Sequence, residues 1–213
     1  MKRIVYLLLS LVLMAETAVA RTPIRQWFVA MPDSVMPLLT KNNRLDFVDF
    51  LDCGMEAVVT NRMDGKSQLM TLTEDYLLMS YTGASDVEMK LLPVNDTTDV
   101  LCMVTTMRTT VRDSRIEFFD EAWRVLDVED VFEAPRLESF RTSERSDSAD
   151  VVWKKMDAYF KTYALSPDED VLTCRLTTLD YLNREDRAMV KPYLKDEQVA
   201  YRWRNGRFTS EKQ

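Results

Sequence analysis

Apolar and polar positions along the chain change their period near residue 57. Before that point, apolar residues recur every three or four positions in residues 24–31 and 43–54, which is typical of amphipathic helices. From residue 57 onward the period is two and Val, Thr, Tyr and Met are frequent, which predicts strands. The expected strands cover residues 57–62, 67–73, 76–82, 87–94, 100–111 and 116–126, the last with a break near Asp120.

Short polar links join these predicted strands. The segment Met63-Asp64-Gly65-Lys66 is typical of a tight hairpin turn. Parallel neighbours would need crossovers of about a dozen residues, so the short links predict an antiparallel meander. The run 100–111 is apolar on both faces at its start, and we expect it near the centre of the sheet.

A polar connector over residues 134–149 is a possible sub-domain boundary. After it, four apolar residues on one helical face predict a helix over residues 149–163: Trp153, Met156, Phe160 and Tyr163. Strands are expected over residues 171–178 and 198–203, separated by a short helix that Asn183 caps. The sequence therefore predicts one α+β domain over residues 21–213, an antiparallel meander sheet with helices from both chain ends packed on one face.

Residues 1–20 have the three regions of a secretory signal peptide. Lys2 and Arg3 precede the apolar run 4–15, and Ala18-Val19-Ala20 is typical of a cleavage site. We expect an exported protein, periplasmic or extracellular and soluble, since no later run is long and apolar enough to span a bilayer. A membrane-anchored N-terminus is the alternative.

Composition narrows the possible functions. The 213 residues carry a net charge of −7, which disfavours binding to nucleic acids and to anionic membranes. Histidine is absent, which removes Ser-His-Asp triads, Cys-His dyads and zinc sites that use histidine. Acidic clusters at residues 46–52 and 168–170 are typical of a solvated helix face and a polar turn, so we expect no metal or other cofactor.

Candidate binding and catalytic side chains are few. Arg202 and Arg204 alternate with Tyr201 and Trp203, which is typical either of an anion or carbohydrate site or of a half-buried strand with its arginines in solvent. An enzyme would have to use carboxylates, and the acid–base candidates near the predicted strand break are Glu117, Asp120 and Glu121.

Three widely spaced cysteines leave the redox state open. An oxidising compartment would allow one disulfide. The best candidate pair is Cys102 with Cys174, because each lies in a strand-like run that begins Asp-Val-Leu. The alternative is that these two and Cys53 are small hydrophobic residues with free thiols.

Several blocks of the chain are similar to an uncharacterised family of exported proteins from Bacteroides-type bacteria, defined only as a domain of unknown function. The blocks are residues 31–50, 113–119 with Trp123, and 181–187 with 191–194. The resemblance brings no catalytic residue. It does imply envelope glycosylation at Asp-Ser/Thr-apolar sites, for which Ser148 is the first candidate and Ser34 and Thr97 are weaker ones.

Together these observations favour a non-enzymatic soluble envelope protein that binds another protein or a glycan. The alternatives are a histidine-free hydrolase that uses carboxylates on a polysaccharide, and a carrier of a small apolar ligand.

Overall fold

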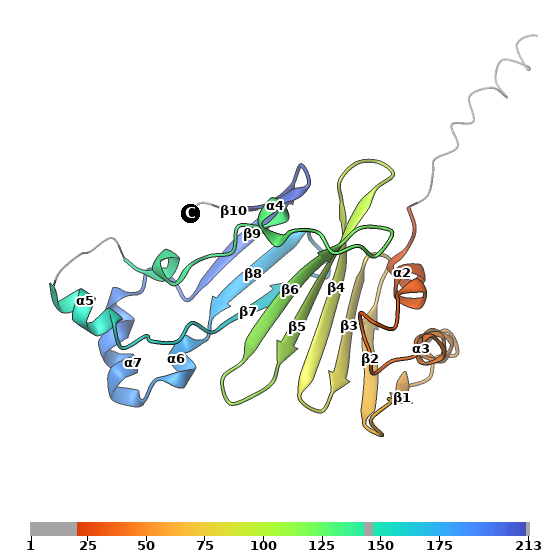
Figure 1. Ribbon diagram of the computed structural model, residues 1–213, viewed down its shortest axis with the longest axis horizontal. Coiled ribbons are helices and arrows are strands. Elements are labelled where there is room, and N and C mark those ends of the chain that lie inside the picture. The colour runs from red at the N-terminus through yellow and green to blue at the C-terminus, as the bar shows by residue number, and fades with distance from the viewer. Residues whose placement is uncertain (1–20, 143–146, 212–213) are drawn as a thin grey trace, which may run out of the picture.

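The computed structural model of the protein describes residues 21–142 and 147–211 (Figure 1). The predicted signal peptide lies outside the described residues. Ten strands form two antiparallel sheets, and short helices accompany them. The α+β class is therefore confirmed.

The first sheet is the predicted meander, with six strands in sequence order. Asp64 adopts a left-handed φ of 58° in the hairpin between the first two strands, as expected for an Asp-Gly turn. Asp120 ends the last strand, because its carboxylate accepts the backbone N–H groups of Ala122 and Arg124. The strands are β1 (Val58–Thr60), β2 (Lys66–Leu72), β3 (Tyr76–Thr82), β4 (Ser85–Pro93), β5 (Asp99–Met107) and β6 (Asp113–Phe119).

A second, four-stranded sheet follows, in the order β10-β9-β8-β7. The predicted helix over residues 149–163 is wrong beyond Trp153, where α5 (Asp147–Trp153) ends. Tyr163 instead pairs with Cys174 in neighbouring strands. Tyr163 is buried in the sheet-side core as a residue of a strand, so its spacing from Trp153 only mimics a helical face. The strands are β7 (Lys161–Leu165), β8 (Val171–Leu176), β9 (Gln198–Arg204) and β10 (Arg207–Ser210).

The longest described helix before the first sheet, α3 (Lys41–Asp52), begins and ends at local signals. Thr40 is its N-cap and forms a capping box with Asn43, so the helix begins before the apolar periodicity that starts at residue 43. Gly54 ends α3 with a φ of 67°, and the N–H of Met55 donates to the carbonyl of Phe50 in a Schellman motif. The remaining helices are α2 (Ile24–Ala30), α4 (Val128–Val131), η1 (Leu137–Phe140), α6 (Thr178–Tyr181), α7 (Arg184–Val190) and η2 (Lys191–Tyr193).

Each face of the six-stranded sheet is covered by a different part of the chain. On one face, which we call the helix side, Phe28 of α2 and Phe47 of α3 pack on Leu77, Met89 and other apolar residues of the sheet. On the other, which we call the sheet side, residues of β7 to β10 pack on β4, β5 and β6. The C-terminal helices α6 and α7 contribute Leu179 and Val190 to this second core. The prediction that helices from both chain ends share one face is therefore wrong in this respect.

Figure 1 shows α2 and α3 beside the β1–β3 end of the first sheet, with the second sheet and α5 to α7 at the opposite end of the molecule. Across residues 21–142 and 147–211, helices with the length and apolar character needed to cross a membrane are absent.

Candidate functional site

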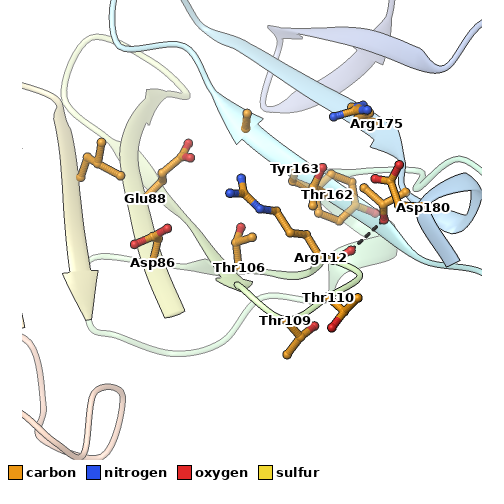
Figure 2. Close-up of a pocket in the computed structure, with 13 residues that line it drawn as sticks. Asp86, Glu88, Thr106, Thr109, Thr110, Arg112, Thr162, Tyr163, Arg175 and Asp180 are labelled. Carbon is orange, nitrogen blue, oxygen red and sulfur yellow. Dashed lines mark hydrogen bonds between the residues drawn. The ribbon is translucent and has the colours of Figure 1, made fainter. Parts of the chain in front are cut away.

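A polar cleft of about 350 Å³ opens where β7 passes over the sheet side of the first sheet (Figure 2). Its walls come from β4, β5, the loop before β6, β7, β8 and α6. Five threonines line it, at positions 106, 109, 110, 162 and 177. Its charged side chains are Asp86, Glu88, Arg112, Arg175 and Asp180. Hydroxyl groups, carboxylates and guanidinium groups thus surround one space, which suits a ligand with several polar atoms.

The acidic side chains of the cleft all have partners within the protein. Asp86 pairs with Arg108 at 3.3 Å, and Asp180 pairs with Arg187 at 3.5 Å. Glu88 accepts the backbone N–H of Leu165 at 2.7 Å. Asp86 and Asp180 are thus ion-paired within the protein, and Glu88 is hydrogen-bonded to its backbone.

The two arginines of the cleft are different. In the part of the chain that the structure describes, neither Arg112 nor Arg175 forms an ion pair. Both side chains are exposed. Their backbones are held firmly, because the buried Thr177 hydroxyl donates to the carbonyl of Arg112 at 2.7 Å and Arg175 lies within β8, paired with Thr162. Two guanidinium groups on fixed elements are thus available to a ligand.

One edge of β7 also faces the first sheet. The N–H of Leu165 points to Glu88, and the N–H of Lys161 points to Asp113 at 3.2 Å. Backbone direction alternates along an antiparallel strand, so the N–H and C=O of Tyr163 point the same way, between these two carboxylates. Tyr163 itself lines the cleft.

Burial perturbs one acid in this site. Desolvation raises the pKa of Glu88, the N–H of Leu165 opposes that rise, and the nearby Asp86 adds to it. Glu88 and Asp86 stand two residues apart on β4 and project from the same side of it, so they do not face one another across a bound substrate. The pair lacks the opposed arrangement that glycosidic hydrolysis uses.

Comparison with known proteins supplies a family. The model of a family described as "Protein of unknown function (DUF3256)" matches residues 16–208. The chain belongs to the DUF3256 family. The predicted resemblance to an uncharacterised family is confirmed to this extent, while export remains a prediction.

This DUF3256 protein is also similar to a solved structure, described as a domain of an uncharacterized protein from Porphyromonas gingivalis W83. The two share 27% sequence identity with a TM-score of 0.79, over 88% of this chain and 98% of the other. No curated protein matches the chain. The arrangement of the two sheets is thus shared, and the chemistry of the cleft has to be argued from this DUF3256 protein itself.

The predicted arginine pair lies outside the cleft. Arg202 is held between Glu169 at 2.9 Å and Glu211 at 2.6 Å, and Arg204 is exposed at the end of β9. Tyr201 and Trp203 are buried, in the alternation expected of a half-buried strand. An anion or carbohydrate site at these arginines stays a prediction.

The cysteines are free thiols in the structure. Cys102 and Cys174 are buried in the sheet-side core, and burial raises the pKa of both thiols, that of Cys174 to about 12. Cys53 is exposed after α3. The disulfide between Cys102 and Cys174 stays a prediction. The side chain of Ser148 lies outside the described residues, so its glycosylation also stays a prediction.

The three carboxylates proposed for catalysis occupy separate surroundings. Glu117 pairs with Arg115 at 2.5 Å and lines a groove on the helix side. Hydrogen bonds from Arg124 and Ala122 hold the pKa of Asp120 below its usual range, and Asp120 serves the loop after β6. Glu121 lines a different pocket, beside Trp27. The structure thus does not bring them together.

Sequence reasoning missed the cleft residues Glu88, Arg112 and Arg175. In β4, Glu88 and Lys90 alternate with Val87 and Met89, a pattern that is typical of a strand with one face in solvent. Lys90 is in fact buried, 2% exposed, and binds Asp75 at 2.8 Å and the Pro167 carbonyl at 3.0 Å. The apolar Leu92 follows on the same face, and it was the one signal that this face is covered.

Proposed function

We propose that this DUF3256 protein is a non-enzymatic envelope protein that binds a glycan in the cleft between its two sheets. One observation carries the proposal: two arginines that have no ion-pair partner among the described residues stand in a cleft lined by five threonines. Sugar hydroxyls both donate and accept hydrogen bonds, so a ligand of this kind can use guanidinium, hydroxyl and carboxylate groups together. The predicted signal peptide, if cleaved, would deliver the protein to the compartment where such glycans occur.

The edge of β7 argues for a glycan over an extended peptide. A peptide strand added to β7 would need the N–H groups of Lys161 and Leu165, and these already donate to Asp113 and Glu88. Carboxylates at a strand edge also oppose strand addition, because the incoming carbonyls would face negative charge. A ligand that needs only isolated hydrogen bonds meets no such obstacle.

The other two candidate functions find less support in the cleft. Its carboxylates are engaged with Arg108, Arg187 and the backbone of β7, which leaves them poorly placed as an acid–base pair. A carrier of apolar ligands would need an apolar lining, whereas threonines and charged residues predominate here.

A bulky side chain in the cleft tests the proposal. Ala164 is exposed on β7 and lines the cleft, so Ala164→Trp should fill the space while leaving the core intact. The matched control is Ala188→Trp, at an exposed position of α7 outside the cleft.

Binding of fluorescently labelled protein to an array of bacterial and dietary glycans is the measurement. We expect the unmodified protein and Ala188→Trp to bind the same glycans, and Ala164→Trp to lose that binding with an unchanged melting temperature. Equal binding by Ala164→Trp would place the glycan elsewhere, and an array without any bound glycan would contradict the proposed function.

A further inference from the structure

We infer that the glycan recognised in the cleft is an acidic one, and that Arg112 and Arg175 receive carboxylate groups of its sugar-acid units. This inference rests on the proposed function and narrows its ligand class. It starts from an imbalance of charge within the cleft.

The imbalance lies in which side chains have partners. Asp86 is paired with Arg108 and Asp180 with Arg187, and neither of these two arginines lines the cleft. One carboxylate oxygen of Glu88 accepts the N–H of Leu165. Burial raises the pKa of Glu88 and so favours its neutral form. Within the described residues Glu88 has no ion-pair partner, and neither has Arg112 or Arg175. The two arginines therefore outnumber the one unpaired carboxylate, and the cleft keeps an excess of positive charge.

Arg108, in the same region, is an arginine whose guanidinium has several partners within the protein. Its guanidinium pairs with Asp86 and donates to the carbonyl of Thr82 at 2.9 Å and to the hydroxyl of Ser80 at 3.1 Å. Arg112 follows in the same β5–β6 loop, four residues later, with no comparable partner. Figure 2 shows its side chain extending across the cleft in the direction of β4 rather than away from the protein.

The geometry of a guanidinium group suits a carboxylate. Its planar donors can form two parallel hydrogen bonds with the two carboxylate oxygens, which neutral hydroxyls cannot match in strength. Holding the arginine backbones in advance lowers the entropy lost on binding, and the Thr177 hydroxyl and the β7–β8 pairing do this for Arg112 and Arg175.

Two features separate a sugar acid from a simple anion. The chain carries a net charge of −7, so it offers no general attraction for anions and the recognition has to be local. Three of the five threonine hydroxyls are hydrogen-bonded within the protein, those of Thr106, Thr109 and Thr177. The hydroxyls of Thr110 and Thr162 remain beside the arginines and match a ligand whose carboxylate is surrounded by hydroxyl groups. Uronic-acid units have this combination.

Calorimetric titration of the full protein with trigalacturonic acid, neutral galactotriose and triglutamate tests the inference. We expect trigalacturonic acid to bind more tightly than either of the others by about tenfold or more. Arg112→Gln and Arg175→Gln should each weaken its binding by about tenfold, and added NaCl should weaken it further. Arg204→Gln is the control, because it removes an exposed arginine of the same sheet outside the cleft.

Three outcomes would overturn the inference, and they separate it from the proposed function. If galactotriose binds as tightly as trigalacturonic acid, and the two cleft substitutions do not change this binding, the ligand's carboxylate has no role. The protein would then still be a glycan-binding protein. Tighter binding of triglutamate would assign the arginines to an acidic peptide and contradict both statements. If trigalacturonic acid and every acidic glycan of the array fail to bind while neutral array glycans bind, the inference alone fails. All three substituted side chains are exposed, so each variant should fold, which circular dichroism can verify.

Discussion

Both faces of the first sheet are covered over β4, β5 and β6, yet the chemistry of the two faces differs. In β4 the side chains of Val87, Met89 and Leu91 point to the helix side and are at most 5% exposed. The residues between them, Glu88 and Lys90, point to the sheet side. With Asp86 on the same side as these two, one strand thus carries an apolar row on one face and three charged groups on the other.

Each face reflects what covers it. The helix side packs through apolar contacts with many methionines, which adapt to irregular helix surfaces: Met31, Met36, Met79, Met89 and Met103. On the sheet side, Glu88 and Lys90 reach the backbone of residues 165 and 167, each 77 positions later in the chain. Polar contacts of this kind are directional, so they hold β7 in one position over the first sheet, and the cleft opens beside them.

The largest effect is expected from a cavity on the helix side. Met89 is fully buried, and Met89→Ala should lower the free energy of unfolding by about 2–5 kcal/mol, because the lost contacts leave a void among packed side chains. Urea denaturation measures it. Met70→Ala, at a methionine that is 56% exposed, is the control and should be nearly neutral. Similar losses in both variants would show that the helix side is not tightly packed.

A smaller effect is expected on the pH dependence of the free energy of unfolding. Replacing a carboxylate on the sheet side and one on the helix side should change this dependence in opposite directions. Burial raises the pKa of Glu88 above its usual 4.5, so its contribution favours the folded state below the unfolded pKa and is lost as the pH rises through the folded pKa. Glu88→Gln keeps an oxygen that accepts the N–H of Leu165, but it removes the cost of burying an ionised carboxylate. The variant should therefore gain stability relative to the unmodified protein between about pH 4 and pH 7.

Asp33, in the turn before α3, provides the opposite case. A hydrogen bond from Arg44 holds the pKa of Asp33 below its usual range, so its contribution is present above the unfolded pKa and is lost as the pH falls. Asp33→Asn should therefore lose stability relative to the unmodified protein as the pH rises. Urea denaturation of both variants and of the unmodified protein at the two pH values is the measurement. If the stability difference from the unmodified protein changes with pH in the same direction for both variants, the predicted opposite signs are refuted.

The smallest effect concerns reactivity rather than stability. Exposed Cys53 should react with iodoacetamide in the native protein, whereas Cys102 and Cys174 should react only after unfolding, since burial excludes the reagent and raises their thiol pKa. Mass spectrometry counts the labels. Three labels after unfolding without reductant would confirm free thiols, and one label would instead establish the predicted disulfide.

Much of the fold could be predicted from local sequence. The Asp-Gly hairpin, the Asn183 cap of α7 and the Asn205-Gly206 turn depend on neighbouring residues, and all three occur in the structure. The helix predicted over residues 149–163 was wrong because Tyr163 is governed by its pairing with Cys174, eleven positions later. Periodicity over a short apolar run does not reveal such a partner.

The candidate site was less accessible to sequence reasoning. Arg202 and Arg204 attracted attention because they alternate with aromatic residues, and the structure places them outside the cleft. Arg112 and Arg175 have no distinguishing neighbours in sequence. They share a cleft only because β7 and β8 pack beside the β5–β6 loop.

The sequence by itself determined the strand order of the first sheet, its hairpins and the Asn183 cap of α7, because each depends on the conformation of residues that are close in the chain. Tertiary structure alone decided that a second sheet covers the charged face of β4 and that two arginines there have no ion-pair partner in residues 21–142 and 147–211. Trp203 illustrates the reason: its indole N–H donates to the carbonyl of Pro93, 110 positions earlier. Burial and pairing of a side chain depend on such distant contacts, which period and composition do not encode.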